Sequence, residues 1–129
     1  METLLAKLLI TLNLLGVAIV SISANNIILT PPQSEEFSVR QLVEKYIPEE
    51  FKEVSLRIIK AESNFRADVK NKSSSAKGYA QIIDGSWKHY GCSGDPFNSE
   101  DNIVCMARIL KKDGLTPWNA SKGVWYPTK

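Results

Sequence analysis

Two short segments hold the residues of this chain that are best suited to chemistry. The first is Glu62-Ser63-Asn64-Phe65, at the end of an apolar stretch, and the second is Gly78-Tyr79-Ala80-Gln81. A carboxylic acid held partly out of water keeps its proton near neutral pH, and a protonated acid can cleave a glycosidic bond. Glu62 is therefore the candidate general acid, and the 78–81 segment is expected to fold back over it.

The helix that positions this acid is predicted to begin at Pro48, whose fixed φ suits the first turn of a helix. Phe51 and Ile58 lie on one apolar face of that helix. At 3.6 residues per turn, Glu62 falls within about 20° of the line through them. The acid therefore continues an apolar stripe and is expected at the edge of the core.

Helical patterns dominate the rest of the chain, and strand signals are sparse. A capping box at Ser38 and Gln41 predicts a first helix that starts near Phe37, and Asp84 or Ser86 could cap a short helix. Ser99 is the predicted N-cap of a longer helix that stops at Gly114, and a last short segment covers 117–126. We expect a small, mainly α domain with at most a short β-hairpin in the polar loop 66–77.

The N-terminal part reads as a targeting segment. Residues 8–24 are uncharged and apolar, Lys7 precedes them, and the run ends in small residues, which is typical of an export signal cleaved after Ala24. A retained anchor is the alternative, because the run reaches the lower limit of about 17 residues for crossing a bilayer. Residues 25–36 are predicted to be a linker, and 37–129 the folded domain. The expected location is the periplasm, the cell wall or the extracellular space, with membrane contact only through residues 8–24 if these are kept.

The composition, the net charge and the two cysteines limit the kinds of protein that this chain can be. A chain of 129 residues with 43% hydrophobic content fits one small domain, expected to be a monomer, and its net charge of +2 without a basic stripe argues against nucleic acid. Cys92 and Cys105 predict one disulfide in an exported protein. A metal site of His89 and both cysteines is the alternative, but it lacks a clear fourth ligand. We expect neither a metal nor a cofactor.

Three motifs in one order carry a resemblance to a known family. They are Glu62-Ser63-Asn64-Phe65, then Ala76-Lys77-Gly78-Tyr79-Ala80-Gln81-Ile82, then Asp95-Pro96-Phe97 with Asn102-Ile103. Together they resemble the soluble lytic transglycosylase domain of the lysozyme-like superfamily, over about residues 40–125. The resemblance implies an α+β lysozyme-like fold. It also implies cleavage of the β-1,4 bond between N-acetylmuramic acid and N-acetylglucosamine in peptidoglycan glycan strands.

The family resemblance implies that Glu62 acts as both acid and base. It would protonate the leaving oxygen, and its carboxylate would then take the proton of the muramoyl 6-hydroxyl, whose attack gives a 1,6-anhydro sugar. The N-acetyl group of the substrate replaces the second carboxylate of an ordinary retaining glycosidase. Asp68, Asp84 and Asp95 are the possible second acids, and a turn or cap role is expected for each.

The substrate-binding candidates match family positions around the acid. Ser63 has a competing role as a hydroxyl that bonds the backbone at the helix end, and both Tyr79 and Trp118 have core packing as an alternative. The 118–121 segment replaces a Tyr-Asn-Gly signature of many family members, so the resemblance supplies no residue that supports Glu62. The candidates are Ser63, Gly78, Tyr79, Gln81 and Trp118.

Three other functions remain open from the sequence. The same fold could host a muramidase, which hydrolyses the bond, or a cell-wall-binding or assembly protein that holds glycan without cutting it. A small secreted disulfide-bonded structural protein would make the order of the motifs a coincidence. An acid on an apolar face is costly unless something uses it, which favours an enzyme.

Overall fold

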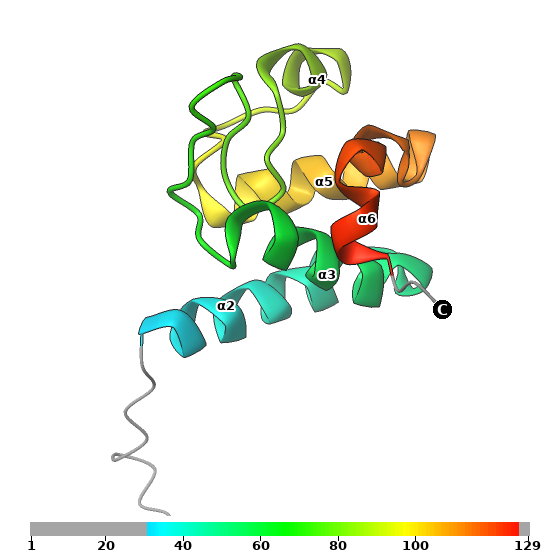
Figure 1. Cartoon of the computed structure of the whole chain (residues 1–129). Coiled ribbons are helices and arrows are strands. Elements are labelled where there is room, and N and C mark those ends of the chain that lie inside the picture. The colour runs from blue at the N-terminus through cyan, green and yellow to red at the C-terminus, as the bar shows by residue number, and fades with distance from the viewer. Residues whose placement is uncertain (1–30, 127–129) are drawn as a thin grey trace, which may run out of the picture.

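The computed structural model describes residues 31–126, and every regular element in that range is helical (Figure 1). The only pairing of strand type there is two isolated antiparallel bridges, which join Lys70 to Lys77 and Lys77 to Ile82. The predicted mainly α class is therefore confirmed. The elements are α2 (Pro31–Tyr46), the 3-10 helix η1 (Glu49–Phe51), α3 (Lys52–Ser63), α4 (Asp84–His89), α5 (Ser99–Asp113), the 3-10 helix η2 (Thr116–Ser121) and α6 (Lys122–Trp125).

Helix α2 begins at Pro31, ahead of the predicted start near Phe37, so residues 31–36 of the predicted linker are helical. Proline is tolerated in a first helical turn, and an ion pair between Glu36 and Arg40 (2.8 Å) supports the added turns. Ser38, the predicted N-cap, lies inside the helix, and its hydroxyl donates to a backbone carbonyl one turn earlier at 2.9 Å. The predicted targeting segment and residues 25–30 lie outside the described residues, as do 127–129. From residue 31 to residue 126, no helix has the length and apolar character needed to cross a bilayer.

The core forms where α2, α3 and α5 meet. Figure 1 shows α2 along one side of the molecule with α3 and α5 packed on it, and both helices contact α2. Segment 64–83 and α4 lie on the side of α3 and α5 away from α2. These three helices supply the largest fully buried apolar side chains: Val39, Val43, Ile58, Ile59, Ile103, Met106, Ile109 and Leu110.

Side-chain caps define the ends of α5 and differ by one residue from the prediction. Asn98, not Ser99, is the N-cap, and its side-chain oxygen accepts from two backbone N–H groups of the first turn. Gly114 ends the helix as predicted, with a φ of 60° that glycine adopts without strain. The hydroxyl of Tyr46 and the ammonium of Lys45 both bond Glu100, which holds the pKa of that carboxyl below its usual range and ties α2 to the start of α5.

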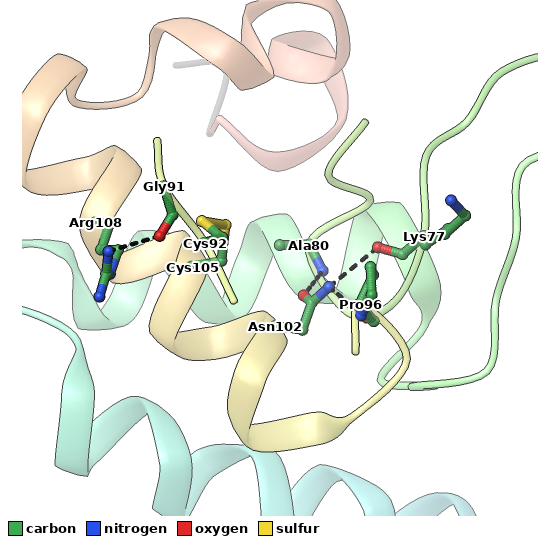
Figure 2. The surroundings of a disulfide bond; sticks show 8 residues. All are labelled: Lys77, Ala80, Gly91, Cys92, Pro96, Asn102, Cys105 and Arg108. Carbon is green, nitrogen blue, oxygen red and sulfur yellow. Dashed lines mark hydrogen bonds between the residues drawn. A yellow bond between two sulfur atoms is a disulfide. The ribbon is translucent and has the colours of Figure 1, made fainter. Parts of the chain in front are cut away.

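The predicted disulfide is present and links the connection after α4 to the middle of α5. Cys92 and Cys105 lie 5.4 Å apart between Cα atoms, and Cys105 is 1% exposed (Figure 2). Arg108 lies beside this bond and donates to the Gly91 carbonyl at 2.8 Å. Both sulfurs are joined to each other, so neither is a thiolate that could bind a metal together with His89.

We expect reduction of this disulfide to lower the free energy of unfolding by about 3 kcal/mol, because the open chain regains the entropy of a loop of about 14 residues. Urea unfolding of the oxidised and the reduced protein measures the difference. The double variant Cys92→Ala/Cys105→Ala is the matched control, since its midpoint should not respond to reductant. A wild-type midpoint that is also unchanged by reduction would contradict the expectation.

Candidate active site

Glu62 lies in the last turn of α3 and is half-buried, at the edge of the core as predicted. The helix ends at once after it, because Asn64 is the C-cap in the left-handed conformation with φ 50°. Asparagine tolerates that conformation better than most residues. Phe65 follows with φ 60° and is 7% exposed, so its ring anchors the helix end in the core. The acid is therefore fixed on a short, well-held piece of backbone.

The carboxylate of Glu62 accepts a hydrogen bond at Oε1 from the hydroxyl of Ser121. Ser121 ends η2, and both η2 and α6 pack against α3. Trp125 of α6 donates from Nε1 to Ser121 Oγ at 3.0 Å. Sequence reasoning did not find Ser121, and the one signal was that the 118–121 segment departs from the family signature.

The 78–81 segment is held by α5. Gly78 has φ +75°, and a Cβ placed there would lie less than 3.0 Å from both the Pro96 carbonyl oxygen and the side chain of Asn102, so only glycine fits. The Asn102 amide is 1% exposed and bonds three backbone groups, as Figure 2 shows. Its oxygen accepts from the Ala80 N–H at 2.9 Å, and its nitrogen donates to the carbonyls of Lys77 at 3.1 Å and Pro96 at 2.8 Å.

Gln81 and Trp118 form one wall of an open hollow of about 500 Å³. Gln81 uses its side-chain nitrogen for its own loop, donating to the carbonyls of Val69 at 3.0 Å and Gly78 at 2.9 Å. Trp118 is 5% exposed, and its indole N–H donates to the Ala80 carbonyl at 2.8 Å. We call this space the α4–η2 hollow, after the elements on its two sides. Its lining residues include Gln81, Ile83, Ser86, Tyr90, Thr116 and Trp118.

A second open hollow, of about 480 Å³, lies between α3 and α6. We call it the α3–α6 hollow; Arg57, Lys60, Ala61, Asn64, Val124 and Trp125 line it. Ser121 Oγ lies within hydrogen-bond distance of the Trp118 carbonyl oxygen (3.1 Å) as well as Trp125 Nε1. The hydroxyl that contacts Glu62 therefore also bonds a residue from the wall of each hollow.

Ser63 and Tyr79 are placed in the structural roles that were their alternatives. The Ser63 hydroxyl is buried and donates to the Ile59 carbonyl one turn back at 2.9 Å. Tyr79 is 3% exposed and belongs to the hydrophobic core. Of the five substrate-binding candidates, Gln81 and Trp118 line the α4–η2 hollow and Gly78 shapes the segment beside it.

The three aspartates weighed as a second acid are exposed and engaged elsewhere. Asp68 pairs with Arg66 at 3.2 Å, and Asp95 accepts from the Phe97 N–H at 2.9 Å in a local turn. Asp84 is not the predicted cap; it starts α4, and its carboxylate pairs with Lys77 at 2.5 Å because that ammonium lies across the loop. No group of three or more His, Cys, Asp or Glu within residues 31–126 could hold a metal ion.

No family model matches the chain, and comparisons with curated proteins and with solved structures gave no match. What the site can do chemically therefore follows from its own groups. These are a half-buried carboxyl group and a hydroxyl that holds one of its oxygens. The indole of Trp118 and the amide of Gln81 line the α4–η2 hollow, but their N–H groups bond backbone carbonyls. Such a set can donate and accept a proton at one point on a bound polar molecule.

Proposed function

We propose that the protein is an exported peptidoglycan lytic transglycosylase. It cleaves the β-1,4 bond between N-acetylmuramic acid and N-acetylglucosamine, with Glu62 as the single acid and base. The observation that carries the proposal is the half-buried carboxylate of Glu62, held at Oε1 by Ser121 so that Oε2 is left for substrate. The order of the three sequence motifs supplies the class of substrate.

The surroundings of the acid favour a mechanism with one carboxylate. Two-carboxylate glycosidases place their acids about 5–10 Å apart on either side of the scissile bond. Asp68, Asp84 and Asp95 are exposed and are engaged in ion pairs or a turn, so none is held in reserve as a nucleophile. Asp113 lies on the wall of the α4–η2 hollow, where it accepts a hydrogen bond from the Tyr90 hydroxyl at 2.5 Å. In the proposed mechanism the second group comes from the substrate, whose own N-acetyl oxygen can stabilise the positive charge that develops at C1.

The proposed reaction moves one proton out and one proton back at Glu62. The carboxylic acid protonates the glycosidic oxygen as the bond to C1 breaks, and the N-acetylglucosamine side leaves as an alcohol. The carboxylate then takes the proton of the muramoyl 6-hydroxyl while that oxygen bonds to C1. The acid is restored, no water is consumed, and the muramoyl end is left as a 1,6-anhydro ring.

The α4–η2 hollow is the proposed place for the glycan. Glu62 is not among its lining residues, and the two are linked through Ser121, whose hydroxyl contacts Glu62 and lies 3.1 Å from the carbonyl of Trp118 on the wall. A volume of about 500 Å³ lies within the range of about 300–1,000 Å³ typical of small-molecule sites. Its lining combines the apolar Ile83 with the polar Ser86 and Gln81, which suits a sugar that carries acetamido and hydroxyl groups. Trp118 contributes a rigid wall that is fixed by its bond to Ala80.

Digestion of purified peptidoglycan tests the proposal, with the released muropeptides identified by mass spectrometry. We expect products that end in anhydro-muramic acid, each lighter by one water than the corresponding hydrolysis product. Products with a reducing muramic acid would instead make the enzyme a muramidase. Binding to peptidoglycan without turnover would make the protein a wall-binding or assembly factor, and either result would overturn the transglycosylase assignment.

A further inference from the structure

The contact between Ser121 and Glu62 gives a role to a segment that the family resemblance left unassigned. Ser121 lies 59 positions after Glu62, at the junction of η2 and α6, and its hydroxyl contacts a carboxylate oxygen. A serine placed there only for solubility would face solvent. This one is partly buried and has three polar groups around its oxygen.

The hydrogen-bond chemistry of these groups fixes the direction of the network. A serine hydroxyl has one proton and two lone pairs, whereas an indole N–H can only donate. Trp125 is 2% exposed, and its single indole N–H is shared between Ser121 Oγ at 3.0 Å and the Trp118 carbonyl at 3.2 Å, so the serine oxygen can only accept from that side. The serine proton is then left for the carboxylate of Glu62 or for the Trp118 carbonyl at 3.1 Å. An ionised carboxylate is the stronger acceptor of the two.

We infer that Ser121 is the positioning residue for Glu62, and that Trp125 orients the Ser121 hydroxyl for this task. This inference rests on the proposed function, because a fixed carboxyl group matters most if the carboxyl group reacts. The bond occupies Oε1 and fixes the plane of the carboxyl group, so Oε2 presents its proton to the scissile bond. A neutral acid still offers its carbonyl oxygen as an acceptor, so the contact persists when Glu62 changes protonation state.

A purely structural role for Ser121 is the competing explanation. Its hydroxyl lies within reach of a carbonyl three residues earlier, an arrangement that could simply close the last turn of η2. The two roles differ in what they predict. A positioning role affects the chemical step, whereas closing a turn affects the stability of η2 and leaves the rate of a folded variant unchanged.

Kinetics on soluble glycan strands prepared from peptidoglycan separate the two roles. We expect Ser121→Ala to lower kcat by about 10- to 100-fold, the scale of a misplaced reacting group, with KM within about two-fold of wild type. Ser121→Thr keeps the hydroxyl and should recover most of the loss. Trp125→Phe removes the orienting N–H together with part of a buried ring, so circular dichroism first checks that it is folded; the kcat of the folded variant should lie between those of wild type and Ser121→Ala. Ser38→Ala is the matched control, because that serine also bonds a backbone carbonyl but lies in α2.

A second measurement does not depend on turnover. In protein with ¹³C-labelled glutamate, the side-chain carboxyl resonance that is missing from Glu62→Gln belongs to Glu62. It should move in Ser121→Ala and return toward its wild-type position in Ser121→Thr. If this resonance and kcat are both unchanged in a folded Ser121→Ala protein, the inference is wrong. If wild type releases no product, the proposed function fails, and the resonance alone then decides whether Ser121 holds Glu62.

Discussion

Replacing Glu62 with glutamine should lower the release of anhydro-muropeptides by at least about 10³-fold, because the amide can neither give nor take the proton that both steps require. General acid–base catalysis by one group contributes about 10²–10⁴-fold, and here one group serves both steps. The rate of product release from peptidoglycan, measured by mass spectrometry against an internal standard, gives the ratio.

The same variant should keep its fold, which makes the loss of activity interpretable. Glutamine has nearly the shape of glutamate, and its amide oxygen can still accept the bond from Ser121. Thermal unfolding of Glu62→Gln should therefore follow that of wild type closely. Loss of the fold would also abolish activity, so circular dichroism of the purified variant is recorded before any rate is measured.

The matched controls are Asp68→Asn and Asp95→Asn, which make the same acid-to-amide change at exposed carboxylates. Both should digest peptidoglycan within about two-fold of wild type. If either loses as much activity as Glu62→Gln, the mechanism uses a second carboxylate and the single-acid proposal is wrong. If Glu62→Gln digests peptidoglycan as fast as wild type, Glu62 is not the acid.

Local signals predicted the helix ends only in part. Gly114 ends α5 as predicted, because glycine adopts a positive φ without strain. Pro48, the predicted start of the helix that carries the acid, lies before the 3-10 helix η1 with ψ 143°, and α3 itself begins at Lys52. The start of α2 could not be predicted in the same way. Ser38 and Gln41 have the spacing of a capping box, but the Ser38 hydroxyl bonds a carbonyl one turn earlier inside the helix and does not cap it. The exposed ion pair between Glu36 and Arg40 spans the predicted start and contributes about 0.2–0.5 kcal/mol to the added turns.

In the candidate site too, features set within one helix were predictable from the sequence, whereas contacts between distant segments were not. The position of Glu62 on the apolar stripe follows from its register on one helix, and the structure places it at the edge of the core. The contact with Ser121 depends on how η2 and α6 fold back onto α3, and residue types alone do not encode that packing. Ser63 shows that a match to a family position can also mislead. A serine hydroxyl in a helix readily bonds the carbonyl one turn earlier, and Ser63 does so with Ile59.

Replacing Asn102 with alanine should give the largest loss of stability among single substitutions near the site, about 3–5 kcal/mol. The substitution leaves three buried backbone groups without their partner: the Ala80 N–H and the carbonyls of Lys77 and Pro96. Each buried polar group left unpaired costs about 1–3 kcal/mol, and a cavity adds to this. Urea unfolding followed by circular dichroism measures the difference.

Two comparisons show whether the hydrogen bonds of Asn102 cause this loss. Asn102→Asp keeps the oxygen that accepts from Ala80 but sets a second oxygen against the two carbonyls, so at neutral pH it should be at least as unstable as Asn102→Ala. Asn98→Ala removes an asparagine from the N-cap of the same helix and should cost only about 1 kcal/mol. If Asn102→Ala unfolds within about 1 kcal/mol of wild type, the amide does not hold the 78–81 segment.

Asn102→Ala should also disturb the wall of the α4–η2 hollow. The Ala80 N–H bonds Asn102, and the Ala80 carbonyl accepts the indole N–H of Trp118, so one peptide segment joins α5 to η2. Once the amide is removed, the 78–81 segment no longer has a fixed position against which Trp118 packs. At temperatures where Asn102→Ala remains folded, we therefore expect higher KM values for glycan strands, and Asn98→Ala should keep the wild-type KM.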